Sequence, residues 1–228
     1  MSHLPLLLDL QGKKCLIIGA GTVGKRKTSL LLDCGAEDIL VVDPNQSSEV
    51  FQKSISHPAV SFVQRSFSPA DLKGVSLVIA SSSDYKLNLD ISRICEKENI
   101  LCNIVDAPEL GSFIVPALHK QGDLMISVST SGSSPAMAKR LKDDLAKIYG
   151  PEYELWLKIL SRVRSLVFKY GYPTQENTRI FRSLVQEDIY LAIKTKNKLQ
   201  LSQLLHQKLP NSLHHAIRGL INDLFDPI

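Results

Sequence analysis

The chain has 228 residues and a mass of 25.3 kDa, which is enough for one large domain or two modest ones. Hydrophobic residues make up 44% of it and charged residues 22%, a balance typical of a globular protein. The net charge is only +4, and no dense run of Lys and Arg is interleaved with aromatic residues, so we expect no nucleic-acid partner. No window approaches the ~18 apolar residues that cross a bilayer, and the first residues do not resemble a secretory signal. We therefore expect a cytoplasmic protein without a membrane partner.

The first hundred residues alternate between strand and helix patterns. Short apolar runs predict five strands, at residues 14–20, 38–43, 60–66, 75–83 and 100–106. Helical spacing predicts helices at 23–36, around 47–55 and at 86–99, with a capped helical turn at 68–72. Strands separated by helical segments imply right-handed crossovers and a parallel sheet. We therefore predict the α/β class, with a Rossmann-like doubly wound parallel sheet over residues 1–113.

The pattern changes after residue 106. Two strand-like runs, 112–120 and 124–130, are joined by Gln121-Gly122-Asp123, which predicts a β-hairpin. In the helical stretch that follows, Ser134 is placed to be the N-cap and Pro135 to be the first helical residue. We predict a hairpin-and-helix segment over residues 114–150 and a small all-helical domain over 151–228. The helices expected in that domain are at 152–171, 178–196 and 201–209.

The stretch GAGTVG places Gly19, Gly21 and Gly24 in the GxGxxG spacing of a dinucleotide-binding loop. Gly19 permits a tight turn, Gly21 lets the backbone approach a pyrophosphate, and Gly24 lets the helix pack closely on the sheet. Asp43 ends the second strand, where an acid would bind the ribose 2′-hydroxyl of NAD and repel the 2′-phosphate of NADP. The alternatives are a glycine-rich turn of another fold and an Asp43 that only shapes a turn. Because the motif follows a strand and opens a helix, we predict that residues 1–113 bind NAD.

Asp106 stands at the end of the fifth predicted strand. In doubly wound sheets, ligands bind beyond the carboxyl ends of the strands. A partly desolvated carboxylate at this edge would be suited to general-base work. The alternative is that Asp106 caps the turn into Ala107 and Pro108. The residues alone leave both interpretations open.

The cysteines and histidines do not suggest a metal site. No CxxC pair is present, and adjacent histidines rarely share one ion. We expect the cysteines to be small buried apolar residues and the histidines near the end of the chain to lie on a surface helix. The residues concerned are Cys15, Cys34, Cys95, Cys102, His206, His214 and His215.

Several motifs together resemble the precorrin-2 dehydrogenase family, which includes the N-terminal module of bacterial sirohaem synthase and the yeast bifunctional dehydrogenase–chelatase. In chain order they are HLPLLLDLQGKKCLIIGAG (3–21), VGKRKTSLLLDCGA (23–36), ASSSDYKLN (80–88), NIVD (103–106), FIVPA (113–117) and the stretch from Ser131 to Leu141. The resemblance covers residues 3 to about 150 and is weak beyond them. One departure is that the family's Thr-Asp-Asp after the fourth strand is Ser82-Ser83-Asp84 here.

The resemblance implies oxidation of precorrin-2 to sirohydrochlorin with hydride transfer to NAD⁺, and in some members insertion of iron. It implies a homodimer in which the hairpin and helical segments build the interface. The family's catalytic aspartate matches Asp106. The positions expected to bind the cofactor are Gly19, Gly21, Thr22, Val23, Gly24, Asp43, Pro44 and Ser81.

The tetrapyrrole substrate carries eight carboxylates, so cationic and polar contacts are expected. The candidates are Asn103, Ser134, Lys139 and Arg140. Lys139 is explained as well by a solvated helix face, whereas Arg140 is favoured by the family motif. Ser134 matches the serine that is phosphorylated in some members. The stretch Lys-Arg-Lys at 25–27 is expected on an exposed face of the nucleotide-binding helix.

Two other classes of protein are considered. A nucleotide-sensing regulatory module of the channel-gating type uses the same glycine loop and strand-end acid, but it does not need the segment after residue 106. A chelatase without redox function does not need an intact glycine loop with Asp43. We therefore expect an NAD-dependent precorrin-2 dehydrogenase, with the regulatory module as the alternative.

Overall fold

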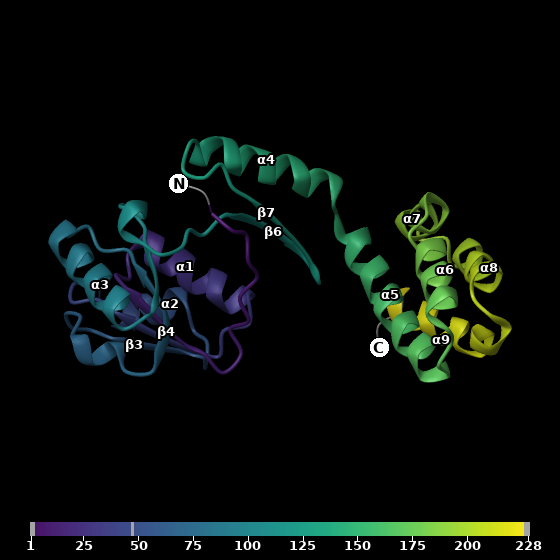
Figure 1. Ribbon diagram of the computed structural model, residues 1–228, viewed down its shortest axis with the longest axis horizontal. Coiled ribbons are helices and arrows are strands. Elements are labelled where there is room, and N and C mark those ends of the chain that lie inside the picture. Colours follow the sequence, from purple (N-terminus) through teal and green to yellow (C-terminus); the bar gives the residue numbers. More distant parts are fainter. Residues whose placement is uncertain (1–2, 47, 226–228) are drawn as a thin grey trace. The chain divides into compact units, whose positions relative to one another are not determined.

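Figure 1 shows a computed structural model of the chain, which describes residues 3–46 and 48–225. The chain divides into two compact units, Met1–Val115 and Pro116–Ile228. Each unit has a hydrophobic core of its own. Within the described residues, no helix is both long enough and apolar enough to cross a membrane.

The first unit is built on a five-stranded sheet in the order β3-β2-β1-β4-β5. All four neighbouring pairs of strands are parallel, which confirms the predicted doubly wound sheet. The strands are shorter than the sequence suggests, because the residues beyond their carboxyl ends form loops. Their bounds are β1 (Lys14–Ile18), β2 (Asp38–Val42), β3 (Val60–Val63), β4 (Val75–Ala80) and β5 (Leu101–Ile104).

Helices cover both faces of the sheet (Figure 1). They are α1 (Thr22–Asp33), α2 (Ser48–Ser54) and α3 (Tyr85–Lys97), which confirms the three predicted helices, although residue 47 lies outside the described residues. One apolar cluster contains Leu31 of α1 and Phe51 of α2, and the other contains Ile91 of α3. Alternate residues of β1 belong to the two clusters, as the two-residue period of a strand requires. The sheet is therefore buried on both faces.

The connection from β3 to β4 contains the predicted capped turn, a 3₁₀ helix at Pro69–Leu72. Ser68 and Asp71 form a capping box, in which Ser68 Oγ accepts from the Ala70 N–H and the Asp71 carboxylate accepts from the Ser68 N–H. Both terminal nitrogens of Arg65 donate to the Asp71 carboxylate, at 2.8 and 2.5 Å. The pKa of Asp71 is held below its ordinary value, chiefly by these bonds from Arg65.

The strand predicted at 112–120 begins only at residue 117. A short 3₁₀ helix, Pro108–Leu110, follows β5, and residues 111–116 are irregular. The apolar residues there suggested a strand, but Pro116 has no N–H group to donate to a ladder. The prediction was therefore wrong for the first half of this segment.

The second unit begins with the predicted hairpin, β6 (Ala117–Gln121) and β7 (Leu124–Val128). The helix α4 (Pro135–Ile148) packs against it, and Ser134 and Pro135 occupy the predicted N-cap and first helical position. The His119 ring nitrogen Nε2 lies 2.8 Å from the Tyr149 carbonyl oxygen just beyond α4. The hairpin and α4 therefore form one layered element.

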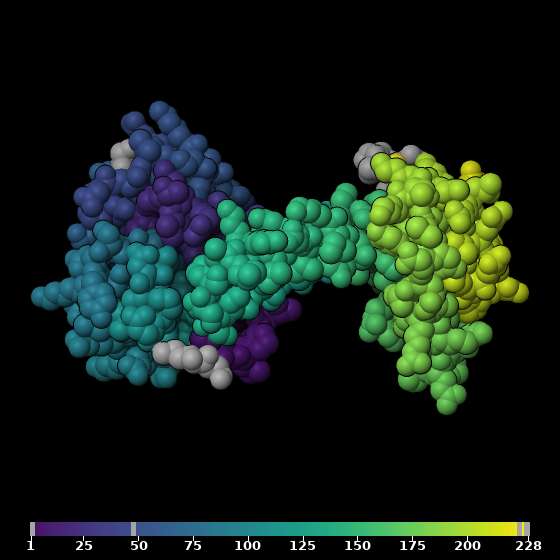
Figure 2. All heavy atoms as spheres, turned by 90° about the horizontal axis from the view of Figure 1, so that it is seen from above, coloured from purple at the N-terminus to yellow at the C-terminus, as the bar shows by residue number. Residues whose placement is uncertain are grey.

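The rest of the second unit is helical, as predicted, and its atoms pack into a continuous body (Figure 2, green to yellow). The helices are α5 (Pro151–Tyr170), α6 (Thr174–Leu184), α7 (Glu187–Lys194), α8 (Lys198–Lys208) and α9 (His214–Phe225). The single helix predicted at 178–196 is wrong, because Gln186 has an extended backbone and is the N-cap of a separate helix, α7. Because α6 ends at Leu184, the carbonyl oxygen of this residue needs a partner outside the helix. The Trp156 indole N–H donates to it at 2.9 Å.

Candidate active site

The glycine loop, residues 19–24, connects β1 to α1 at the carboxyl end of the sheet. Gly19 has a φ of +98°, which L side chains rarely adopt. At Gly24, an added Cβ would lie 1.9 Å from the Gly19 carbonyl oxygen. These two glycines are therefore required by the packing of the loop itself.

Gly21 has different surroundings. It is the N-cap of α1 with a φ of −66°, and no heavy atom lies within 4 Å of the place that its Cβ would take. Among the described residues, no side chain caps α1, and its first turn has no acidic residue. The N–H groups at the start of α1 thus have no side-chain cap and carry a partial positive charge. A pyrophosphate fits this surface, since backbone N–H groups can bind its oxygens where the Cβ is missing.

Asp43 follows β2 and connects it to the glycine loop. The Ala20 N–H donates to Asp43 Oδ2 at 2.6 Å, and the N–H groups of Asn45 and Gln46 donate to Oδ1 at 2.7 and 3.1 Å. Asp43 therefore shapes a turn and also holds the loop beside β2. A carboxylate offers about four acceptor positions, so capacity remains for a ribose hydroxyl. The two interpretations of Asp43 are compatible.

Ser81 follows β4 and braces the glycine loop from the neighbouring strand. Its hydroxyl lies within hydrogen-bond distance of the carbonyl oxygens of Ile18 and Gly19, at 3.1 and 2.9 Å. The structure therefore brings Ser81, Asp43 and the glycine loop together. The other predicted cofactor positions lie beside them, with Thr22 and Val23 in the first turn of α1 and Pro44 directly after Asp43.

The turn after β4 contains the departure from the family pattern. Asp84 is the N-cap of α3, and its carboxylate accepts from the N–H groups of Lys86 and Leu87. Asn88, the last residue of the family motif at 80–88, is buried and donates from Nδ2 to the Ser82 carbonyl oxygen at 2.9 Å. The cap of α3 is therefore made by Asp84, the position of the three that keeps the family's aspartate.

Asp106 lies two residues beyond β5, at the same edge of the sheet as the glycine loop, because β4 alone separates β5 from β1. Its side chain is exposed, so the partial desolvation expected from the sequence is wrong. Within residues 3–46 and 48–225, no hydrogen bond or ion pair to its carboxylate is found. It does not cap the turn into Ala107, and the turn-former interpretation loses its support.

Asn103 is buried in β5, and its Nδ2 donates to the Phe113 carbonyl oxygen at 3.0 Å. This bond ties the strand to the segment that follows it. A contact between Asn103 and the substrate stays a prediction. No sequence pattern indicates the direction of this amide, because its partner lies ten residues further along an irregular segment.

The remaining predicted substrate contacts belong to the second unit. The Ser134 hydroxyl accepts from the Met137 N–H at 3.2 Å. The Arg140 side chain is 78% exposed, and its Nε lies 3.9 Å from an oxygen of Asp144. Lys139 is exposed on the same helix. The structure thus places these three residues along the first half of α4.

The Lys-Arg-Lys stretch of α1 is less exposed than predicted. Arg26 is exposed, but Lys25 and Lys27 are half-buried. Burial, followed by the charge of Arg26, lowers the pKa of Lys27 to about 8.

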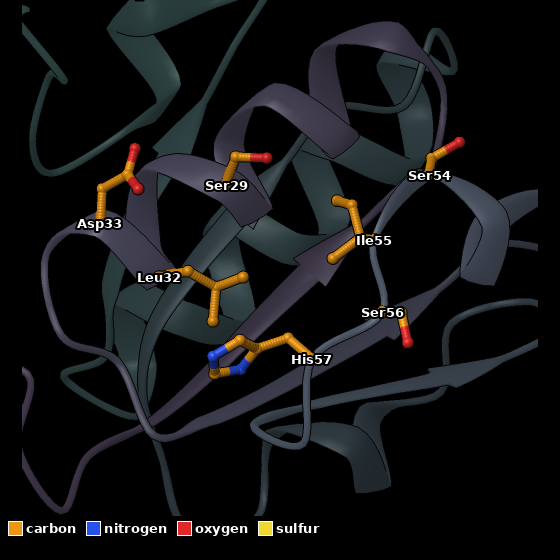
Figure 3. Close-up of a pocket in the computed structure, with 7 residues that line it drawn as sticks. All are labelled: Ser29, Leu32, Asp33, Ser54, Ile55, Ser56 and His57. Carbon is orange, nitrogen blue, oxygen red and sulfur yellow. The ribbon is translucent and has the colours of Figure 1, made fainter.

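An open hollow of about 400 Å³ lies between the carboxyl end of α1 and the residues before β3. In Figure 3, Leu32 of α1 and Ile55 point towards this space from opposite sides. The hollow is at the end of α1 far from the glycine loop, at the amino ends of the strands. None of the predicted site residues lines it, so it is not part of the candidate site.

The sheet order, the glycine loop and the strand-end acid define a Rossmann-like, NAD(P)-binding protein. Two family models match the chain. "Putative NAD(P)-binding" covers residues 6–117, and "Sirohaem biosynthesis protein central" covers residues 121–148. The second match begins within the hairpin and ends with α4.

Curated relatives extend this assignment. The chain is 33% identical to "Siroheme synthase" of Methylobacillus flagellatus over 85% of this chain and 40% of that protein. It is 30% identical to "Siroheme synthase 2" of Klebsiella pneumoniae over 94% of this chain and 47% of that protein. The chain therefore spans less than half the length of these relatives. The solved structure "SirC, precorrin-2 dehydrogenase" has the same fold, with a TM-score of 0.71 and 24% identity over 89% of this chain and 98% of that one.

These matches cover the two parts of one module in the order in which the chain contains them. The chain belongs to the family of the sirohaem synthase N-terminal module, which consists of an NAD(P)-binding domain and a central domain.

Proposed function

We propose that the protein is a precorrin-2 dehydrogenase, which oxidises precorrin-2 to sirohydrochlorin and passes a hydride to NAD⁺. The names of the relatives and the shared fold support this substrate class. The observation that carries the proposal is the exposed Asp106 carboxylate. It has no partner among the described residues and lies at the sheet edge that also carries the glycine loop.

The reaction removes a hydride and a proton from the substrate. Bound NAD⁺ supplies the hydride acceptor. The N–H groups at the start of α1 would hold its pyrophosphate, for which Gly21 leaves room. Asp106 takes the proton, because no protein group among the described residues competes for its carboxylate oxygens. The turn after β5 thus carries the proposed general base.

We infer that NAD is the preferred cofactor rather than NADP. The Asp43 carboxylate lies next to the glycine loop, where it is held by the Ala20 N–H. It can accept a hydrogen bond from a ribose 2′-hydroxyl and would repel a 2′-phosphate. Replacing Asp43 with Ser should narrow the preference for NAD⁺ over NADP⁺, measured as the ratio of the two kcat/KM values.

The second unit is proposed to bind the carboxylates of the substrate. Lys139 and Arg140 are exposed cations on α4, and the N-terminal N–H groups of that helix lie near Ser134. Phosphorylation of Ser134 would add roughly −1.5 to −2 charge and repel such a substrate. The family resemblance further supports a homodimer formed by residues 114–150, and insertion of iron as a second activity.

The test is to supply precorrin-2 and NAD⁺ to the purified protein and to follow NADH formation. Asp106→Asn, which keeps the shape of the side chain and removes the base, should lower kcat by about 10²-fold or more. Asp90→Asn is the matched control, since Asp90 is an exposed acid of α3 that pairs only loosely with Arg93, at 3.9 Å. An Asp106→Asn enzyme with unchanged kcat would remove Asp106 from the mechanism. A wild-type protein that forms no NADH would refute the proposed function. Chelatase activity is tested separately. Fe²⁺ is added after the oxidation is complete, and insertion of iron into sirohydrochlorin is followed by the absorption spectrum.

The alternative of a nucleotide-sensing module has less support. Such a module needs the glycine loop and Asp43 but has no use for a hairpin and α4. The match of residues 121–148 to the sirohaem biosynthesis central domain favours the enzyme.

A further inference from the structure

The segment after Asp106, residues 107–113, folds back along the open edge of β5. We refer to it as the strap. We propose that Ser112 and Asn103 clamp the strap to β5 and thereby act as positioning residues for Asp106. This inference rests on the proposed function and deepens it, since it names what holds the base in place.

Ser112 binds both backbone groups of Cys102 on the free edge of β5. The Ser112 N–H donates to the Cys102 carbonyl oxygen at 2.8 Å, and the Cys102 N–H donates to Ser112 Oγ at 2.9 Å. The Ser112 hydroxyl also lies 3.4 Å from the Cys102 carbonyl oxygen. Ser112 therefore satisfies both backbone groups of Cys102, as a paired strand would. The sequence pattern predicts that Ser112 begins a strand. In the structure, Ser112 instead covers the unpaired edge of β5.

Three further contacts hold the strap. The buried Asn103 amide donates to the Phe113 carbonyl oxygen at 3.0 Å, next to the serine. The Ser92 hydroxyl of α3 donates to the Leu110 carbonyl oxygen at 2.5 Å. Gly111 lies so close to β5 that an added Cβ would be 2.9 Å from the Cys102 carbonyl oxygen. The strap is thus fixed over residues 110–113.

The chain is also fixed on the other side of Asp106. The Val105 N–H donates to the Ala80 carbonyl oxygen at 2.9 Å, which continues the pairing of β5 with β4. Asp106 stands between this bond and the strap, and within the described residues its own carboxylate has no bond that orients it. Its position must therefore come from the backbone on both sides. A misplacement of about 1 Å in a reacting group can cost on the order of 10²-fold in rate.

The first experiment measures turnover of precorrin-2 with NAD⁺ by Ser112→Ala. We expect kcat to fall about tenfold while the affinity for NADH, measured by fluorescence titration, stays within twofold of wild type. Ser112→Thr, which keeps the hydroxyl, should restore turnover. Ser61→Ala is the matched control, because Ser61 is an exposed serine of β3 at the opposite edge of the sheet. Unchanged kcat in Ser112→Ala would overturn the proposal.

A double-mutant cycle separates positioning from general damage. If Ser112 acts through Asp106, Ser112→Ala should have little further effect in an Asp106→Asn background. An equal fold-loss in both backgrounds would show that Ser112 acts elsewhere and would overturn the proposal.

A second experiment does not depend on the reaction. Amide hydrogen exchange of residues 105–111 should be at least tenfold faster in Ser112→Ala than in Ser61→Ala, while exchange in β1 and β4 stays unchanged. Unchanged exchange of residues 105–111 would refute the clamp even if the protein oxidises precorrin-2. If the protein does not oxidise precorrin-2, accelerated exchange still supports the clamp, and only the proposed function fails.

Discussion

Gly21 and Gly24 lie three residues apart, but the space around their missing side chains differs. Gly24 is closed in by the Gly19 carbonyl oxygen, so its missing side chain serves the protein's own packing. Gly21 faces open space at the start of α1, so its missing side chain leaves room for the proposed cofactor. One motif therefore contains a glycine that the packing of the loop requires and a glycine that we propose for cofactor binding.

The same substitution should separate these roles. Gly21→Ala should leave the thermal midpoint within about 2 °C of wild type, because an exposed N-cap has room for a Cβ, and should weaken NADH binding at least tenfold. Gly24→Ala should destabilise the first unit by about 2–4 kcal/mol, since α1 must move away from the loop. Calorimetry and fluorescence titration of both variants are the measurements. A Gly24→Ala protein as stable as wild type would contradict the close contact.

Lys27 is a second residue whose surroundings have a measurable consequence. Its folded pKa of about 8 lies below the ordinary value of 10.5, so between these values the unfolded chain holds a proton that the folded protein has lost. The contribution of Lys27 to stability should therefore rise with pH from about 8 to 10.5.

Lys27→Met should accordingly raise the thermal midpoint at pH 7, by the equivalent of about 1 kcal/mol after allowance for solvent screening. The gap to wild type should close as the pH approaches 10. Lys86→Met, a change at an exposed lysine of α3, is the control and should show no such pH dependence. A gap that stays constant with pH would contradict the lowered pKa.

At the scale of elements, local patterns predicted most of what the structure contains. The alternation of strands and helices, the glycine loop and the turn at residues 69–72 each depend on residues close together in the chain. The break between α6 and α7 was missed, because apolar spacing continues across it, and the carbonyl of Leu184 finds its partner in Trp156, 28 residues earlier. The strap was misread for the same reason, since Ser112 is bound to Cys102 across an edge that no local pattern marks.

The turn between β3 and β4 is an element whose stability should depend on pH. The pKa of Asp71 is lowered in the folded protein, chiefly by its bonds from Arg65. A lowered carboxyl pKa adds stability above the unfolded value of 3.8, and this is lost as the pH falls through the folded value.

Asp71→Asn should therefore lower the thermal midpoint by about 5 °C at pH 7, and the gap should shrink below pH 4, about the unfolded value. Asp90→Asn serves as the control, because the Asp90 side chain is 54% exposed and its nearest cation is 3.9 Å away. An Asp71→Asn gap that persists unchanged in acid would mean that shape, rather than charge, holds the turn.

At the scale of the whole molecule, the chain contains two units with separate cores. The sheet's two apolar clusters belong entirely to Met1–Val115, and the helical cluster belongs entirely to Pro116–Ile228. The cofactor loop lies in the first unit alone. Ligand binding should therefore change the thermal midpoint of the first unit, and changes in the helical core should alter the midpoint of the second.

We expect calorimetry to resolve two unfolding transitions. NADH should raise only the transition of the first unit, because a ligand stabilises the state that binds it. Leu184→Ala should lower only the other, by about 2–5 kcal/mol, since Leu184 is fully buried in the helical core. Leu199→Ala, at a position 71% exposed on α8, is the matched control. A single transition that moves with both NADH and Leu184→Ala would show instead that the two cores unfold as one cooperative unit.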